Sequence, residues 1–422
     1  MQGNFSYHNP TKLYFGDESL NYLMRYLVTL LLIISTLNGW AQNTSFARGA
    51  DVSWCTEMEA DNVKFCNKEG VETDIFALMK QIGMTAIRLR VWVNPSAYGY
   101  GAWCDKIDVV AKAKRAHAQG LDLMIDFHYS DFFTDPGTQN TPLDWKDYSL
   151  EQMKAAVAEH TKDVLQALTD EGITPKWVQV GNETSNGMIW PKGKIDWDKS
   201  GSARYYDYVA LSNAGYYAVK DVFPNAYVIV HHDNAYQNLA WFYREFKNAG
   251  GKFDMIGLSH YPDYDNWNST QNDVASNPNA ANSVKSLGQT FNVPVMIVET
   301  GFRNYNATRA RNVMQDLFDR MMAISQCAGI FYWEPQVNGT WKPQYYNKLG
   351  WGAYGMGAFS TYQTMYRPTE ALDAFKDPNP SGIVAPTACA SKSNVYYDLQ
   401  GRRVSPSTKG LYVCNGTKVV VK

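Results

Sequence analysis

Residues 177–187 read WVQVGNETSNG, a buried strand that runs into an acidic residue. The apolar run from 177 to 180 predicts the strand, and Glu183 follows it after Gly181 and Asn182. A carboxylate at the end of a buried strand is seldom kept without a partner or a task. The stretch therefore predicts one strand of a buried sheet with a functional residue at its end.

Seven other apolar runs of similar length occur along the chain, and each ends in polar or aromatic residues. With the run above they cover 47–53, 86–93, 121–129, 177–183, 226–232, 253–261, 294–300 and 329–335. Helical periodicity lies between them, for instance over 150–172 and 307–325. We therefore predict a (β/α)8 TIM barrel with enlarged βα loops over 42–376. A doubly wound sheet would need a Gly-rich phosphate turn after its first strand, and none is present.

The overall charge argues for an uncharged partner. The 422 residues include 39 Lys and Arg against 41 Asp and Glu, a net charge of -2. This balance gives no field for nucleic acid and no signal for a membrane surface. Aromatic residues make up 14% of the chain, with 13 Trp and 28 Tyr, and rings exposed in a cleft suit sugars. We expect a monomer that needs no nucleotide cofactor.

The N-terminal region has the pattern of an export signal. Residues 24–41 combine a basic start, an apolar stretch too short to span a bilayer and a small-residue end. We expect the protein to be periplasmic, on the cell surface or extracellular. Residues 1–23 precede this signal and resemble the opening of iron-dependent alcohol dehydrogenases, but no metal or nucleotide motif follows. We interpret them as a misplaced start or a fusion scar.

The C-terminal region differs in composition from the barrel. Residues 377–393 are rich in Pro, Ser and Gly and predict a linker, and 394–422 predict a short β-like tail. The tail resembles those that serve sorting or attachment in exported proteins. Export also makes the six cysteines candidates for disulfides, with Cys389 and Cys414 as the tail pair. The other four are Cys55, Cys66, Cys104 and Cys327.

A barrel places its chemistry at the carboxyl ends of the strands. In the second run, Arg88, Arg90 and Trp92 share one parity and are predicted to point inward, away from the helices. The residues that end later runs are His128, Glu183, His260, Tyr261, Glu299, Trp333 and Glu334. These side chains are the candidates for the site.

Glu183 and Glu299 end the fourth and seventh runs, on opposite sides of the predicted cleft. Hydrolysis of a glycosidic bond needs such a pair, one acid for the leaving oxygen and one carboxylate to attack or to activate water. A separation of about 5 Å would give retention, and one above roughly 6.5 Å inversion. A salt-bridged strand-end acid is the alternative for Glu183 alone. Glu334 is an ion-pair or subsite candidate, and Glu57 a substrate or loop-ordering contact.

Eight phrases occur along the chain in this order: GADVSW, RLRVWVNP, DFHYSDFFTDPGTQNTPLDW, VQVGNE, VIVHHDN, HYPDY, VETGF and YWEPQ. Together they resemble glycoside hydrolase family 53, the endo-β-1,4-galactanases that cut arabinogalactan and pectic galactan side chains. The resemblance spans 47–376. It implies a retaining mechanism in which Glu183 is the general acid/base and Glu299 the nucleophile.

The resemblance also implies roles for the residues around this pair. Asn182 would donate to the sugar 2-hydroxyl. Arg88, with Arg90, would keep the nucleophile ionised, and Tyr261 would steady it. The predicted sugar contacts are His128, His260, Trp92, Trp333 and Glu57. The two histidines could instead be ordinary hydrogen-bonded barrel residues, and Trp92 could pack beneath the rim.

We predict no catalytic metal or other cofactor. The adjacent His231 and His232 have opposite parity, so their rings should face opposite sides of the strand and share no ion. Some family members carry a structural calcium, and the acid-rich segment 263–268 is the candidate host, with a solvated loop as the alternative.

Three other functions remain open from the sequence. A retaining barrel hydrolase could act on mannan, xylan or glucan, although the long phrase after the third run argues against it. A surface glycan-binding protein with a dead barrel would lack one of the glutamates, and both are present. A dehydrogenase would rest on the first twenty or so residues alone, and we expect no such activity.

Overall fold

A computed structural model describes residues 46–99, 101–262 and 276–376, together with 396–397, 403–404, 410–414 and 417–421. Several sequence predictions fall elsewhere: the start at 1–23, the signal at 24–41, the calcium host at 263–268 and the linker at 377–393 all lie outside the described residues. None of the helices in the described part is long and apolar enough to cross a membrane.

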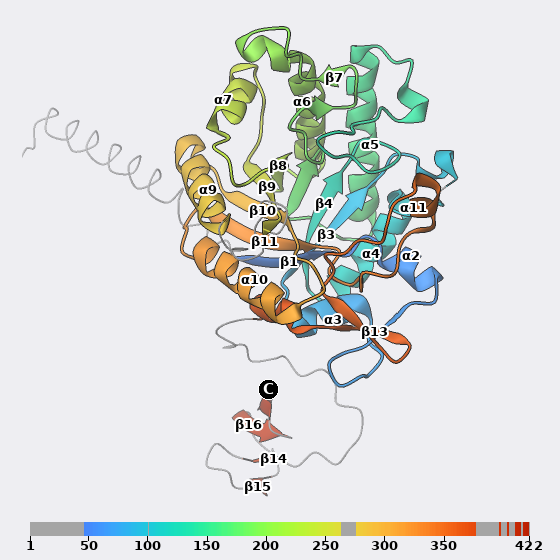
Figure 1. Ribbon diagram of the computed structural model, residues 1–422, viewed down its shortest axis with the longest axis vertical. Helices are drawn as coiled ribbons and strands as arrows, with labels where there is room; N and C mark the ends of the chain where they lie inside the picture. The colour runs from blue at the N-terminus through green and yellow to red at the C-terminus, as the bar shows by residue number, and fades with distance from the viewer. Residues whose placement is uncertain are drawn as a thin grey trace, which may run out of the picture.

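Eight parallel strands close into a barrel, which confirms the predicted fold (Figure 1). Around the barrel the order is β1, β11, β10, β9, β8, β5, β4 and β3. The strands are β1 (Ala47–Asp51), β3 (Ala86–Val91), β4 (Asp122–Phe127), β5 (Trp177–Val180), β8 (Tyr227–His232), β9 (Met255–His260), β10 (Val295–Thr300) and β11 (Cys327–Trp333). Every predicted run overlaps one of these strands, and seven of the eight contain it whole; β11 begins two residues before the run at 329–335.

Helices follow the strands and cover the outside of the barrel (Figure 1). They are α2 (Cys55–Ala60), α3 (Ile75–Ile82), α4 (Lys106–Ala118), α5 (Leu150–Asp170), α6 (Tyr206–Val222), α7 (Ala240–Asn248), α9 (Asn277–Phe291), α10 (Ala307–Met322) and α11 (Gln344–Leu349). Side chains fix several starts, for example Asp74 at α3 and a capping box of Ser149 and Gln152 at α5. The eighth unit ends in a short 3-10 helix, η5 (Glu370–Phe375), in place of a long helix.

The loops at the carboxyl ends of the strands are enlarged, as predicted, and carry small elements of their own. These are η2 (Pro95–Tyr98), η3 (Leu143–Trp145), η4 (Gly201–Tyr205), β2 (Lys64–Phe65), β6 (Gly187–Met188), β7 (Gly193–Lys194), β12 (Phe359–Tyr362) and β13 (Met365–Pro368). The C-terminal tail forms a separate sheet of β14 (Tyr396–Tyr397), β15 (Arg403–Val404), β16 (Gly410–Cys414) and β17 (Thr417–Val421).

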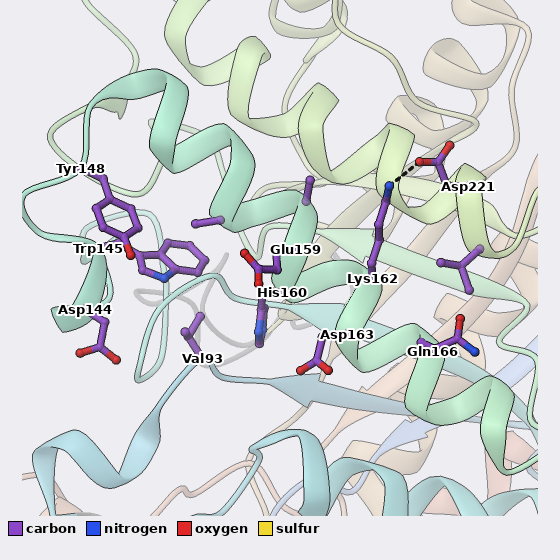
Figure 2. A pocket seen from close by; sticks show the side chains of 13 residues that line it. Val93, Asp144, Trp145, Tyr148, Glu159, His160, Lys162, Asp163, Gln166 and Asp221 are labelled. Atoms are coloured by element: carbon purple, nitrogen blue, oxygen red, sulfur yellow. Dashed lines mark ion pairs between the residues drawn. The ribbon is translucent and has the colours of Figure 1, made fainter.

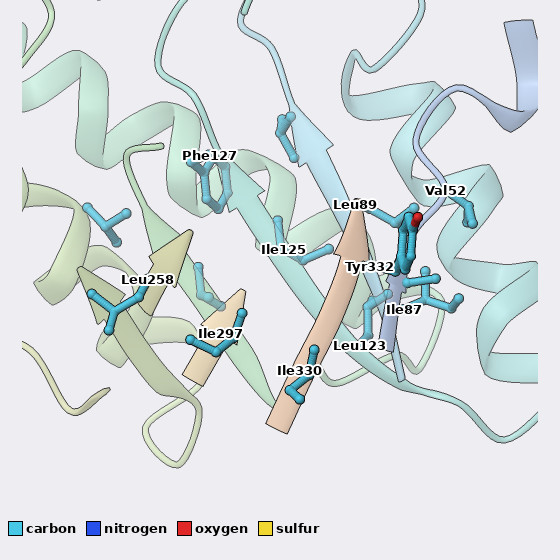
Figure 3. Close-up of a cluster of buried hydrophobic side chains, with 14 of the residues drawn as sticks. Val52, Ile87, Leu89, Leu123, Ile125, Phe127, Leu258, Ile297, Ile330 and Tyr332 are labelled. Carbon is cyan, nitrogen blue, oxygen red and sulfur yellow. The ribbon is translucent and has the colours of Figure 1, made fainter. Parts of the chain in front are cut away.

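Two apolar clusters hold the barrel together. The larger one lies between strands and helices and contains Ile87, Leu89 and Phe127, shown in Figure 3. The smaller one brings together inward-facing residues such as Trp177 and Phe331. Strand alternation explains the division, because successive side chains point to opposite faces of the sheet. Inward-facing polar residues occupy the later positions of the same strands, where the site lies.

Strand β10 carries an irregularity that decides where Glu299 points. Ile297 pairs with Leu258 of β9, but Glu299 pairs with Ser259, the very next residue of that strand. Val298 therefore has no paired residue on β9, and this extra residue is the arrangement of a β-bulge. Because of this extra residue, Val298 belongs to the inner apolar cluster and Glu299 still shares the side of Ser259.

Candidate active site

Arg88 lies inside the barrel and binds carboxylates from three strands. Its Nη1 is 2.8 Å from Asp51 Oδ2, and its Nη2 is 2.8 Å from both Asp126 Oδ2 and Glu299 Oε1. Burial alone would lower the pKa of Arg88, but Asp126, Glu299 and Asp51 together raise it above its ordinary value. Arg88 therefore stays charged and holds its partners in place.

Glu299 has the surroundings of a carboxylate kept ready to react. Besides Arg88, it accepts a hydrogen bond of 3.1 Å from the Tyr261 hydroxyl at Oε2. Only 6% of Glu299 is exposed. Burial raises the pKa of Glu299 above its usual value of 4.5, and the positive charge of Arg88 opposes that rise. Both predicted neighbours, Arg88 and Tyr261, thus contact Glu299.

Glu183 lies just beyond β5 and turns its carboxyl group toward β9. Its backbone has a φ of 47°, in the left-handed region that residues other than glycine rarely adopt. The Ser259 hydroxyl donates to Glu183 Oε1 over 2.6 Å. Burial raises the pKa of Glu183 well above 4.5, and the charge of Glu299 raises it further. The two glutamates therefore interact, and the negative charge of Glu299 favours the protonated form of Glu183.

Asn182 is held between Arg88 and the loop that follows β4. Its Oδ1 accepts from Arg88 Nη2 over 2.9 Å, and its Nδ2 donates to the Thr134 carbonyl over 2.8 Å. An amide nitrogen carries two hydrogens, so one further donor is left for a ligand.

Arg90 serves a different carboxylate from Arg88. It forms a buried ion pair with Glu334, which also accepts from the Trp54 backbone N–H and from Gln336 Nε2. Burial raises the pKa of Glu334 to about 7, and Arg90 opposes the shift. Glu334 is fully enclosed, which corresponds to the ion-pair alternative for this residue. Arg90 contacts Glu334, whereas the ion pair to Glu299 comes from Arg88.

The two predicted histidines are held by protein groups. His128 accepts from the Thr134 backbone N–H at Nδ1 over 3.0 Å, and its Nε2 lies 3.0 Å from Asp126 Oδ2. His260 was expected at the cleft, but the structure places it on the helix side of β9, with Nε2 2.8 Å from Asn277 Oδ1 of α9. This correction follows from strand alternation, because Ser259 and Tyr261 take the inward positions on either side of His260.

The two predicted stacking tryptophans differ in exposure. Trp92 is 1% exposed and packs against Phe132 and Phe133, so neither ring face is open to a sugar and the rim-packing alternative applies. Trp333 is only partly buried. Trp333 is the last residue of β11, and the centroid of its ring lies 5.1 Å from that of Trp54.

Glu57 is buried in α2, and burial raises its pKa to about 8 against the opposing charge of Arg90. It lines a hollow with Trp103 and Tyr345. The charges that act on it most strongly are those of Arg90 and Asp61.

Comparison with known proteins agrees with this geometry. The model of the family described as Glycosyl hydrolase family 53 matches residues 47–375. The chain belongs to this family. It is 31% identical to an endo-β-1,4-galactanase of Bacillus subtilis over 369 residues, which cover 78% of this chain and 79% of that protein. It is 29% identical to an arabinogalactan endo-β-1,4-galactanase of Cellvibrio japonicus, covering 82% of this chain and 94% of that one.

Solved structures of family 53 are also similar to this chain. A fungal β-1,4-galactanase is 25% identical with a TM-score of 0.66, and the match covers 78% of this chain and 98% of that one. A family 53 catalytic domain of Ignisphaera aggregans is 28% identical with a TM-score of 0.65, covering 79% and 96%. The predicted family is confirmed, and the chain is a glycoside hydrolase.

Five residues at the centre of this family 53 site were not among the sequence candidates. They are Asp51, Asp126, Gln179, His231 and Ser259. Strand alternation could have indicated two of them. Asp126 lies two positions before His128, and Gln179 lies four positions before Glu183, so each is on the same face of its strand as a residue already predicted to point inward. The contacts of the other three depend on how neighbouring strands are aligned, which one sequence does not state.

His231 and His232 face opposite sides of β8, as predicted. His231 Nε2 lies 2.9 Å from Ser259 Oγ inside the barrel, whereas the ring of His232 packs on Phe242 of α7. Within the described ranges, no group of three or more His, Cys, Asp or Glu could hold a metal ion.

The prediction that the cysteines form disulfides is wrong for four of the six. Cys55, Cys66, Cys104 and Cys327 are free and buried, so none of these four forms a disulfide. The proposed pairing of Cys389 with Cys414 lies outside the described side chains.

A separate hollow on the outside of α5 is lined by Trp145, Tyr148 and His160 (Figure 2). An ion pair of 2.6 Å joins Lys162 to Asp221 at its edge. Burial lowers the pKa of His160 to about 4, so this ring is neutral near pH 7. The hollow contains neither Glu183 nor Glu299 and is distinct from the site above.

Proposed function

We propose that this protein is an endo-acting hydrolase of β-1,4-galactosidic bonds in galactan and type I arabinogalactan, with retention at the anomeric carbon. The names of the family 53 relatives support the substrate. One observation carries the roles of the two acids: the positive charge of Arg88 opposes the rise in the pKa of Glu299, whereas the negative charge of Glu299 adds to the rise in the pKa of Glu183.

In the first step, a carboxylate oxygen of Glu299 attacks the anomeric carbon while Glu183 gives its proton to the departing glycosidic oxygen. The carbon–oxygen bond of the linkage breaks and a glycosyl ester on Glu299 forms. Loss of the charge on Glu299 removes the second-largest contribution that raises the pKa of Glu183. Glu183 therefore becomes a better base at the moment a base is required.

In the second step, Glu183 removes a proton from water, and the resulting oxygen attacks the same carbon from the side the leaving group vacated. The ester bond to Glu299 breaks, and the carboxylate returns to Arg88. Two inversions give net retention. The free N–H of Asn182 would hold the sugar 2-hydroxyl, and Trp333 would offer a ring to the apolar face of a galactosyl unit.

Substrate choice is tested by reducing-sugar release from potato galactan, with glucomannan and xylan as comparisons. We expect release from galactan alone, with internal cuts visible as a rapid fall in viscosity. Equal or greater release from xylan or glucomannan would contradict the galactan assignment and favour another retaining barrel hydrolase. A chain that binds galactan without any turnover would instead be a glycan-binding protein.

The two acids are tested separately. Glu299→Ala should reduce kcat on galactan at least about 1000-fold, because no covalent intermediate can form.

Glu183→Gln should slow galactan cleavage strongly but largely spare the first step on dinitrophenyl galactosides, whose leaving group needs no protonation. Equal loss on both substrates would remove Glu183 from the acid role. Anomer analysis of early products by NMR checks retention.

A further inference from the structure

His231 and Ser259 connect the backbone of Glu183 to its own side chain. The Glu183 backbone N–H donates to His231 Nδ1 over 3.2 Å. On the other side of the ring, His231 Nε2 lies 2.9 Å from Ser259 Oγ, and Ser259 Oγ lies 2.6 Å from Glu183 Oε1. The three contacts thus form a closed path that begins at the backbone of Glu183 and ends at its carboxyl group. Both His231 and Ser259 are at least 99% buried, so water does not compete for these contacts.

The network fixes which nitrogen of His231 carries the proton. A backbone amide can only donate, so His231 Nδ1 must accept from Glu183 and carries no hydrogen of its own. Asn182 Oδ1 lies 3.0 Å from the same nitrogen and takes its hydrogen from Arg88 instead. Burial and the nearby charge of Arg88 lower the pKa of His231 well below 6.5, so the ring has a single proton. That proton is therefore on Nε2.

The direction of the remaining hydrogen bonds follows from this tautomer. Ser259 Oγ receives the Nε2 hydrogen of His231 and must send its own hydrogen to Glu183 Oε1. If Oε1 were protonated, two hydrogens would point at each other along this 2.6 Å contact. The proton of the carboxylic acid is then restricted to the other oxygen, Oε2.

We propose that His231 and Ser259 are positioning residues of the hydrolytic reaction, which confine the transferable proton of Glu183 to Oε2 and hold that oxygen toward the leaving group. This inference rests on the acid/base role proposed above for Glu183. Both residues contact Glu183 directly. Each acts through Glu183, and the chain uses the neighbouring histidine, His232, on the opposite face for packing.

The first test compares leaving groups in Ser259→Ala. Without the hydroxyl, the Glu183 proton can occupy either oxygen, so steps that need protonation should suffer most. We expect kcat/KM to fall about tenfold for galactan and phenyl galactobioside but less than about twofold for dinitrophenyl galactobioside. Ser283→Ala is the matched control, because Ser283 is also buried but donates to the Gln237 carbonyl. A uniform loss on all substrates, or no loss, would overturn the inference.

The second test is the pH profile of kcat/KM. The Ser259 hydrogen bond lowers the pKa of Glu183, whereas Glu299, Asp233 and Asp135 raise it. Ser259→Ala removes only the lowering contact, so the basic limb of the profile should move to higher pH. A change that merely loosened the fold would lower the whole curve without moving that limb. An unmoved limb in a folded, active Ser259→Ala protein contradicts the inference.

A third measurement is made on the wild-type protein, and a substitution serves only to assign its signal. The ¹⁵N shifts of histidine in the wild-type protein should show His231 as a neutral ring with hydrogen on Nε2 between about pH 5 and 8. His231→Gln assigns the signal. A ring protonated on Nδ1 would overturn the inference even if Ser259→Ala failed to fold. Failure of the parent proposal looks different, since the wild-type protein would then leave galactan uncut.

Discussion

Arg88 and Arg90 are buried cations only two positions apart; both lie within 3.9 Å of Asp51, but each also pairs with a glutamate of its own. Arg88 binds Glu299, and Arg90 binds Glu334. Removing one member of a buried ion pair leaves the other charged and unpaired, which costs more than the pair contributes. Replacement of either arginine therefore affects the fold, but only Arg88 acts directly on the carboxylate that we propose as the nucleophile.

Glu57 should make the stability of the protein depend on pH. Burial raises its pKa from 4.5 to about 8 in the folded protein. Between these values the unfolded chain has lost the proton that the folded protein keeps, so the free energy of unfolding falls as pH rises. We expect Glu57→Gln to gain about 4 kcal/mol relative to wild type as the pH rises from 4.5 to 8, because each unit of pKa difference is worth about 1.4 kcal/mol.

Urea unfolding of both proteins at several pH values checks this expectation. Glu59→Gln is a suitable control, since Glu59 lies in the same helix but forms a partly exposed ion pair with Arg115. Parallel stability curves for wild type and Glu57→Gln would show that Glu57 is not protonated in the folded state.

The residues of the site that were predicted from sequence share one property. Glu183, Glu299 and Arg88 lie on strands or just past strand ends, where parity and position limit what a side chain can face. The contacts missed from sequence, such as the one between Ser259 and Glu183, join residues 76 positions apart across the barrel. Their alignment depends on strand register, which is a property of pairs of segments.

Strand β10 shows how a regular pattern can hide a local exception. The sequence placed Glu299 at the end of a strand, and the structure agrees. Simple alternation from Met296 and Val298, both in the inner apolar cluster, would nevertheless turn Glu299 toward the helices. The extra residue at Val298 restores the inward direction. A run of apolar residues gives no sign of such a bulge, so it could not have been predicted.

Strand β1 contains a close approach that can be tested directly. A Cβ atom on Gly49 would lie 2.2 to 2.6 Å from ring atoms of Phe331, far inside contact distance. Gly49→Ala should therefore lower stability by about 1–3 kcal/mol, because a packed interior resists added volume. Thermal unfolding measures the change. Gly352→Ala is the control, since nothing lies within 4 Å of the added atom, and an equal effect of both would refute the packing argument.

The barrel as a whole was predictable because eight similar units repeat along the chain. The helical part of its last unit was not, because α11 is short and η5 takes the place of an eighth long helix. Short segments carry too few turns for a periodic pattern to emerge. The export signal and the linker remain predictions, as does attachment through the tail.

The whole barrel should be stable without disulfides. Four of the six cysteines are buried free thiols. We expect these four to react with a thiol reagent only after unfolding, and the melting temperature to be the same with and without a reductant in a Cys389→Ser, Cys414→Ser double variant. Mass spectrometry after alkylation counts the reacted thiols. Rapid reaction of the native protein, or a lower melting temperature under reduction, would contradict the packing of these residues.

The contacts of Arg88 tie activity to the completion of the molecule. Its three acidic partners come from β1, β4 and β10, so the first and the seventh barrel strands must both be in place before its pairing is complete. During synthesis β1 emerges long before β10, and until β10 joins, Arg88 lacks the carboxylate of Glu299, which we propose as the nucleophile. We therefore expect a nascent or nicked chain whose barrel is not closed to have no hydrolytic activity on polysaccharide. Hydrolytic activity itself then reports that the sheet has closed.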